Sequence, residues 1–193
     1  MRLSEQEQQD VKQAVEVMRR GGVIVYPTDT VWGIGCDACN SRAIARVFDI
    51  KHRAESKALI TLVGSMAMLE RTVECIPEAA EMLIEAAVDP VTIIYDRGVG
   101  VATELLAPDG SIGVRLTCDP FAAALCNGLQ RPVVSTSANI SGEPTPGNFA
   151  AINSAILDAA DYVCRSRRDD PPAGKPSMVI KISNNGVFKI LRK

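Results

Sequence analysis

Two short polar segments carry the side chains best suited to holding a small charged ligand. The first is Pro27-Thr28-Asp29-Thr30, and the second is the run STSANISG at 135–142. Their hydroxyl and amide groups can bind a small zwitterion or a phosphate with little positive charge of their own. The same residue types are ordinary turn formers, so the spacing alone leaves a binding site and a capped turn equally open.

Cations in two places offer charge for an anionic ligand. Lys51, Arg53 and Lys57 form a basic cluster, in which lysine supplies a point charge and arginine a planar fork. Such clusters are more often solvated surface. Arg115 differs because it lies inside the apolar run IGVRL at 112–116. A buried guanidinium there needs an anionic partner, which is either a protein carboxylate or a ligand carboxylate.

Several reaction classes lack the residues that they need. His52 is the only histidine, and its cationic neighbours disfavour the imidazolium that a catalytic triad must form. The chain contains neither HExxH nor the P-loop pattern GxxxxGK[ST]. The segment GIGCDA at 33–38 fits the loose dinucleotide-binding pattern, but its glycines follow the predicted strand by several residues. We therefore expect Gly33 and Gly35 to serve a turn or a close backbone approach.

Composition narrows the class of protein further. The chain has 193 residues, 47% of them hydrophobic, and a net charge of −2, which argues against a protein that coats nucleic acid. It has no apolar run long enough for a membrane helix and its N-terminus is polar, so we expect a cytoplasmic protein. Cys36 and Cys39 form the only CxxC pair, and no second ligand pair suits zinc. We expect packing cysteines and no metal site.

Interleaved helix and strand patterns must position these segments. Apolar spacing and capping residues predict helices at about 11–18, 41–51, 77–87, 120–129 and 148–159. Short apolar runs predict strands at 23–26, 58–63, 91–95, 112–116, 133–134, 178–182 and 187–191, with Asn185-Gly186 turning the last hairpin. The alternation predicts an α/β fold with an open twisted sheet of mixed parallel and antiparallel strands, flanking helices and a concave ligand cleft, in a single domain over 1–193.

Six motifs in order resemble the YrdC-like threonylcarbamoyl-AMP synthases. They are PTDTVWGIGCD, KHR followed by KALITLV, DPVT, SIGVRL, VSTSANISGEP and KPSMVIKI, and they span about 21–192. The paired signature K-x-R and S-x-N is present at 51–53 and 137–139, whereas the related YciO-type proteins typically lack both. The chain departs from the pattern at Ala54, where proline is common, at Trp32, where tyrosine is commoner, and in its shortened DPVT motif. These departures concern loop geometry more than chemistry.

The resemblance implies an enzyme that makes threonylcarbamoyl-AMP and pyrophosphate from L-threonine, bicarbonate and ATP, for N6-threonylcarbamoyladenosine modification of tRNA. It implies a nucleotidyltransferase of the single-domain form, without the C-terminal extension of the longer members, that passes its product to a separate tRNA-modifying complex. Mg²⁺ is expected on the ATP phosphates with few protein ligands. By family position, Thr28, Arg115, Ser135 and Ser177 are candidates for binding threonine. Candidates for ATP are Lys51, Arg53, Lys57, Ser111, Ser137, Asn139, Thr145 and Arg192, and of these Lys51 and Arg53 are also catalytic candidates.

Two other functions remain as alternatives at this stage. One is a non-catalytic YrdC-like module that binds RNA, associated with tRNA or the ribosome. The lack of basic, aromatic-rich runs weighs against it. The other is an accessory domain acting on different carbamoyl substrates, as similar domains do within larger carbamoyltransferases.

Overall fold

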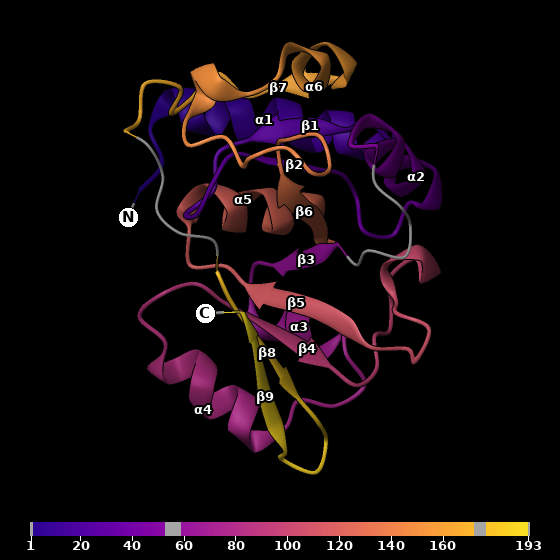
Figure 1. Ribbon diagram of the computed structural model, residues 1–193. Helices are drawn as coiled ribbons and strands as arrows, with labels where there is room; N and C mark the ends of the chain where they lie inside the picture. The colour runs from indigo at the N-terminus through magenta and orange to yellow at the C-terminus, as the bar shows by residue number, and fades with distance from the viewer. Residues whose placement is uncertain (1, 53–58, 172–176, 193) are drawn as a thin grey trace.

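One mixed sheet runs through the molecule in the computed structural model, which describes residues 2–52, 59–171 and 177–192 (Figure 1). From one edge of the sheet to the other, the strands lie in the order β7 (Tyr162–Val163), β1 (Ile24–Tyr26), β2 (Gly33–Gly35), β6 (Val133–Ser137), β3 (Ile60–Val63), β5 (Ile112–Leu116), β4 (Val91–Tyr95), β8 (Met178–Ile182) and β9 (Phe188–Arg192).

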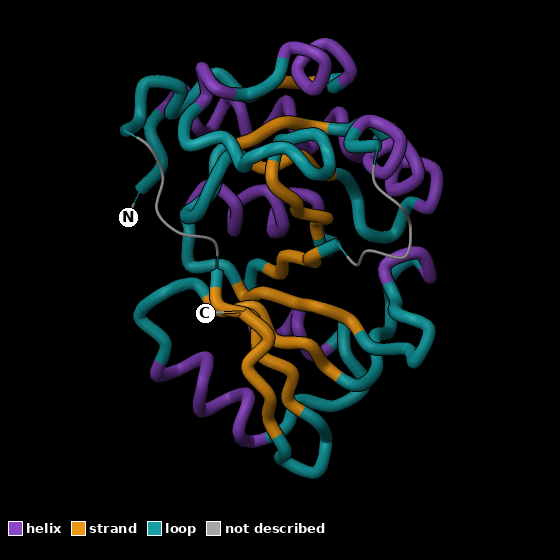
Figure 2. Tube along the Cα trace, viewed as in Figure 1, coloured by secondary structure: helices purple, strands orange, loops and turns teal. Residues whose placement is uncertain are grey.

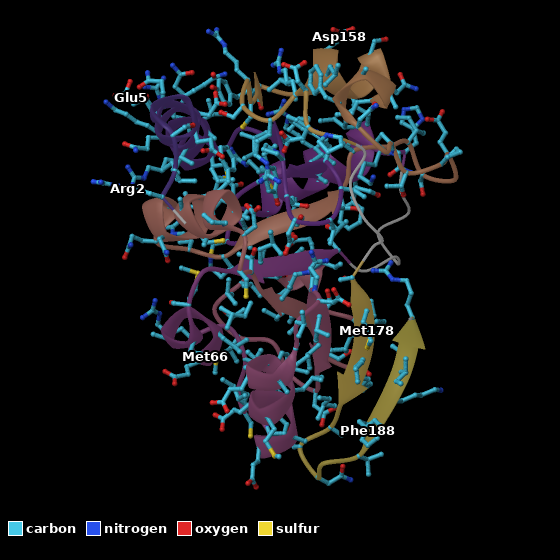
Figure 3. The ribbon with its side chains drawn as sticks, turned by 90° about the vertical axis from the view of Figure 1, so that its left-hand side faces the viewer. Arg2, Glu5, Met66, Asp158, Met178 and Phe188 are labelled. Atoms are coloured by element: carbon cyan, nitrogen blue, oxygen red, sulfur yellow. The ribbon has the colours of Figure 1, made fainter. Side chains whose placement is uncertain are left out.

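The pairing directions make this an open mixed sheet, as the sequence predicts. β3–β5, β4–β8 and β1–β7 are parallel pairs, and the other neighbours run antiparallel. β6 pairs with both β2 and β3, and so joins the upper and lower parts of the molecule in Figure 2. In Figure 3 the β8–β9 hairpin stands at one edge, with Met178 and Phe188 toward its opposite ends. The single domain over 1–193 stays a prediction.

Helices cover the sheet where their apolar faces meet it. The helices are α1 (Glu5–Arg19), α2 (Ser41–Ile50), α3 (Met66–Glu70), α4 (Glu78–Ala86), η1 (Thr103–Leu105), α5 (Pro120–Leu129), η2 (Phe149–Ala151) and α6 (Ser154–Ala159). α1 buries Ala14, Val15 and Met18 and packs along α5, where Arg19 Nη2 donates to the Gly128 carbonyl at 2.7 Å. None of the helices in the described ranges combines the length and apolar character needed to cross a bilayer.

Several elements around the predicted site agree with the sequence, but β6 continues three residues beyond the predicted strand at 133–134, to Ser137. β4, β5, β8 and α5 have the predicted bounds, and Asn40 caps α2 through its Oδ1. Pro77 is an N-cap and not the first helical residue. The predicted helix at 148–159 is wrong, because Asn148 caps a single turn and Asn153 then caps α6. α3, β2 and β7 were not predicted, since each is too short to show a period.

The CxxC pair divides between two environments. Cys36 is buried, whereas Cys39 is exposed and its thiol donates to the Gly100 carbonyl at 3.3 Å. The packing role expected for both residues therefore holds for Cys36 and is wrong for Cys39. No group of three His, Cys, Asp or Glu side chains suited to a metal occurs among the residues that the structure describes.

Gly35 allows β2 to lie against β6. A Cβ atom at this position would lie 1.8 Å from the Val134 carbonyl oxygen, a distance that no side chain can occupy. β2 pairs antiparallel with β6, placing Gly33 opposite Ser137. The close backbone approach expected from the glycine pair is therefore confirmed at Gly35. This contact brings the two polar segments of the sequence to neighbouring strands.

We predict that Gly35→Ala lowers the free energy of unfolding by about 3 kcal/mol, because the added methyl group must displace backbone. Urea unfolding monitored by circular dichroism measures the change. Gly113→Ala is the matched control in β5, since its Cβ would meet nothing closer than 3.7 Å. That control is expected to change stability by less than about 1 kcal/mol. Equal effects of the two substitutions would contradict the packing argument.

Candidate functional site

A cavity of about 410 Å³ lies against one face of the central sheet. Its wall includes Thr92 and Ile94 of β4, Gly113 and Arg115 of β5, and Ser135 and Ser137 of β6. Each pair is two residues apart, and alternate residues of a strand project to the same face. Strand periodicity thus collects hydroxyls and one guanidinium from distant parts of the chain.

The cavity gathers most of the candidate residues. All four threonine candidates line it, as do the nucleotide candidates Ser111, Ser137, Thr145 and Arg192. Lys51 and Asn139 do not line the cavity, but both form hydrogen bonds with Ser137, which does line it. Arg53 and Lys57 lie outside the described residues. The predicted concave cleft therefore exists, and the polar segments after β1 and along β6 share it.

Arg115 is the buried cation of this cavity. Its Nε donates to Thr92 Oγ1 at 3.2 Å, and its Nη2 donates to Ser177 Oγ at 2.7 Å. Nη1 lies 3.4 Å from both Asp29 Oδ1 and Thr30 Oγ1. Burial lowers the pKa of Arg115 and raises that of Asp29, and in each case the partner's charge opposes the shift. Arg115 therefore has one long ion pair with a protein carboxylate and still lines the cavity.

A second guanidinium meets the first at Ser177. Arg192 Nε and Nη2 donate to the Ser177 carbonyl at 3.0 and 2.9 Å, and Nη2 also reaches its hydroxyl at 3.3 Å. Within the described part of the chain, Arg192 has no carboxylate within ion-pair distance. No Asp or Glu is among the described residues that line the cavity. The cavity therefore carries a net positive charge and favours an anion.

Thr28 organises the loop between β1 and β2. Its hydroxyl accepts from the backbone N–H groups of Thr30 and Val31, at 3.1 and 3.2 Å, and donates to the Val31 carbonyl at 2.7 Å. These contacts close a tight turn of the kind that threonine forms with its own backbone. The turn alternative for this segment is therefore confirmed, and the turn forms part of the cavity wall.

Lys51 ties the end of α2 to the loop after β6. Its ammonium, 1% exposed, donates to the carbonyls of Ser137 and Asn139 at 2.5 and 2.6 Å. The Lys51 carbonyl accepts from Ser141 N–H at 2.8 Å. The Ser137 hydroxyl donates to Asn139 Oδ1 at 2.5 Å, and the Asn139 amide donates to the Glu143 carbonyl at 2.7 Å. The lysine of the K-x-R motif is therefore bonded directly to the S-x-N motif.

Ser111 and Thr145 are the remaining predicted residues of the cavity lining. Ser111 is buried, and its N–H and hydroxyl both donate to Asp109 Oδ1, at 3.0 and 2.6 Å. These hydrogen bonds lower the pKa of Asp109 to about 2. Thr145 is exposed and belongs to the cavity lining.

Thr92 was missed as a site residue, although it belongs to the DPVT motif. Its hydroxyl lies between Arg115 Nε and Ser177 Oγ, 2.9 Å from the latter. It is the link that orients the guanidinium, and only the alternation of β4 could have indicated that it faces the cavity.

The Sua5_yciO_yrdC family model, described as "Telomere recombination", matches residues 16–193. The chain belongs to this family. Among curated members of the Sua5/YciO/YrdC family, a threonylcarbamoyl-AMP synthase of Xanthomonas campestris pv. campestris (strain B100) is 34% identical over 157 residues. That match covers 80% of this chain and 84% of the relative. A threonylcarbamoyl-AMP synthase of Xanthomonas oryzae pv. oryzae (strain PXO99A) is 33% identical over 153 residues, covering 78% of this chain and 82% of that protein.

Solved structures of the Sua5/YciO/YrdC family share the fold. The P. abyssi Sua5 complexed with L-threonine superposes with a TM-score of 0.86 at 27% identity, covering all of this chain and 55% of Sua5. This chain thus spans about half the length of that relative. E. coli YciO superposes with a TM-score of 0.82 at 26% identity, covering 96% of this chain and 89% of YciO. The similarity confirms the open mixed sheet with flanking helices.

We predict that Lys51→Met lowers the free energy of unfolding by about 3 kcal/mol, because two buried carbonyls lose a charged donor. Chemical unfolding in urea measures this loss. Lys12→Met is the control, since Lys12 is exposed on α1, and it is expected to stay within about 0.5 kcal/mol. A Lys51→Met protein as stable as the control would contradict the bonding described for this ammonium.

Proposed function

We propose that this chain is an L-threonylcarbamoyladenylate synthase, a nucleotidyltransferase that forms threonylcarbamoyl-AMP and pyrophosphate from L-threonine, bicarbonate and ATP. The observation that carries the proposal is the buried Arg115 in the wall of a hydroxyl-rich cavity beside a second arginine. Support comes from the curated relatives, which are threonylcarbamoyl-AMP synthases at up to 34% identity over most of both chains. In this proposal the product serves N6-threonylcarbamoyladenosine modification of tRNA in the cytoplasm.

Threonine binds at the Arg115 end of the cavity. Its carboxylate forms a bidentate pair of hydrogen bonds with the guanidinium. Asp29, at 3.4 Å, makes only a single long contact with it. Ser177 and Thr92 accept hydrogen bonds from the guanidinium and hold its orientation. Ser135 and the Thr28 turn supply the neighbouring wall, which places the amino group toward the centre of the cavity. The P. abyssi Sua5 structure, a relative with the same fold, is complexed with L-threonine, which supports threonine as the substrate.

ATP occupies the remainder of the cavity, toward Ser111, Ser137, Thr145 and Arg192. Arg192 supplies charge from within the lining, and Lys51 acts through the loop that carries Ser137 and Asn139. Arg53 and Lys57 extend this role as phosphate ligands in the proposal. Mg²⁺ accompanies ATP. Because the described lining offers hydroxyls and no carboxylate, the phosphates and water hold most of its coordination positions.

The reaction requires positioning and charge neutralisation more than a protein base. Threonine and bicarbonate condense to a carbamate with loss of water, one oxygen of the carbamate attacks the α-phosphorus of ATP, and pyrophosphate leaves with the bonding electrons. Arg53 is proposed to stabilise the charge that builds on the departing phosphates, whereas Lys51 contributes to this step by holding the loop that carries Ser137 and Asn139. Leu59, Ile60, Ile94 and Val179 form an apolar part of the wall. Limiting water there protects the carbamate and the acyl-adenylate from hydrolysis.

No observation favours the RNA-binding alternative over this function. A separate tRNA-modifying complex that receives the adenylate is the proposed partner, and direct weak binding of tRNA remains secondary to it. The decisive assay incubates the purified chain with ATP, labelled bicarbonate and each amino acid, and measures pyrophosphate and labelled adenylate. Threonine-dependent release of both products is the expected result. Salt-dependent RNA binding without ATP consumption would replace the proposal with the non-catalytic alternative.

We predict that Arg115→Ala raises the KM for threonine by about 100-fold, which corresponds to the loss of two charge-assisted hydrogen bonds. The KM for ATP is expected to change far less. Steady-state pyrophosphate release with each substrate varied in turn measures both constants. Arg115→Lys, which keeps the charge but loses the fork, should retain part of the defect. A larger effect on ATP than on threonine would show that Arg115 is misassigned.

A further inference from the structure

Arg167 holds a strained backbone position next to the candidate site. Its φ is 61°, in the left-handed region that costs free energy for any residue with a Cβ atom. Its side chain is 27% exposed, and its guanidinium makes three different contacts. Nη1 donates to Asp119 Oδ2 at 2.8 Å, Nε to Asp170 Oδ2 at 3.0 Å, and Nη2 to the Thr28 carbonyl at 3.2 Å.

The contact with Thr28 places Arg167 behind a wall of the cavity. Thr28 and Val31 line the 410 Å³ cavity, and they also line a separate hollow of about 210 Å³ that contains Arg167. The loop 28–31 is therefore a partition between the two spaces. The Thr28 hydroxyl fixes this loop from within, whereas Arg167 binds its backbone from the other side.

The contact with Asp119 connects Arg167 to the strand that bears Arg115. Asp119 is buried and caps α5 directly after β5, with its Oδ1 accepting from Ala122 N–H at 2.9 Å. Asp119 and Asp29 line the same pocket of about 270 Å³, so the negative charges of the two carboxylates repel each other. Each has its own arginine: Arg115 for Asp29 and Arg167 for Asp119. Arg167 thus balances a charge that would otherwise repel the partner of Arg115.

We propose that Arg167 is a positioning residue for the threonine subsite, acting through the Thr28 carbonyl and the Asp119 carboxylate. The proposal rests on the proposed function for its substrate. Arg167 does not touch the cavity itself. It holds the loop 28–31 at a fixed distance from β5, and that loop presents Thr30 and Asp29 to Arg115 Nη1. If this loop becomes mobile, the Arg115 guanidinium is no longer held in the orientation that receives the carboxylate of threonine.

The test compares Arg167→Gly with Arg165→Gly. Glycine suits the left-handed backbone at 167, so this substitution removes the side chain without adding strain. Arg165 is exposed, and no contact of its side chain is found in the described part of the chain. Its substitution adds the same backbone freedom two residues away. Amide hydrogen exchange of the segment 24–32 and the KM values for threonine and ATP are measured for both variants and the unaltered chain.

We expect Arg167→Gly to speed exchange in 24–32 and to raise the KM for threonine by about 10-fold, as for one lost charge-assisted hydrogen bond. The KM for ATP and the turnover at saturating threonine should stay within about 3-fold of the values for the unaltered chain, because the lost contact affects the binding of threonine only. Arg165→Gly should change none of these. Asp119→Asn keeps the cap on α5, and combining it with Arg167→Gly should add less than its separate effect.

Three results would overturn the proposal. These are unchanged exchange in 24–32, an equal rise of both KM values, and full additivity of Asp119→Asn with Arg167→Gly. Because hydrogen exchange needs no substrate, it tests the support of the loop by itself. Faster exchange in Arg167→Gly, together with an unaltered chain that releases no pyrophosphate with threonine, would keep the support of the loop and reject the proposed function.

Discussion

A guanidinium group that leaves water must find acceptors for its N–H donors, and Arg115 determines the arrangement of the site by this need. Its acceptors come from the loop after β1, from β4 and from the residue before β8. Three segments far apart in the sequence therefore converge on one side chain. Because the only carboxylate among them is 3.4 Å away, the arrangement satisfies the cation while keeping it available to a ligand.

The hydroxyls of the cavity are fixed in place before any ligand arrives. The Thr28 side chain closes its own turn, and the Ser137 hydroxyl donates to Asn139. Such internal hydrogen bonds reduce the conformational entropy lost on binding. They suit a reaction whose substrates must be aligned but need no proton taken by the protein. Although the whole chain has a net charge of −2, the charged side chains among the described residues of the cavity lining are all positive.

The sequence predicted some of the elements that hold the site, but only the first two residues of β6 and none of β2. β4 and β5 are mostly apolar runs, and α5 has an aspartate cap and a proline at its first position, so their bounds could be predicted. β2 contains a single apolar side chain between two glycines and shows no alternation. The residue types of the site could also be predicted, because clustered hydroxyls at strand ends and a cation within an apolar run are unusual. Their partners were not, since Lys51 and Ser137 are 86 residues apart and only the tertiary pairing of β6 brings them together.

The contacts of Lys51 give a physical reason for the joint occurrence of K-x-R and S-x-N. Its ammonium binds the carbonyls of the first and last residues of S-x-N, and these carbonyls turn the chain at the end of β6. A neutral side chain of similar length could fill the space but would leave both oxygens without a donor, which is costly in a buried place. A serine and an asparagine without the lysine would likewise lose the backbone geometry that aims their side chains. The two motifs therefore form one structural unit, in which the charge of Lys51 shapes the loop that carries Ser137 and Asn139.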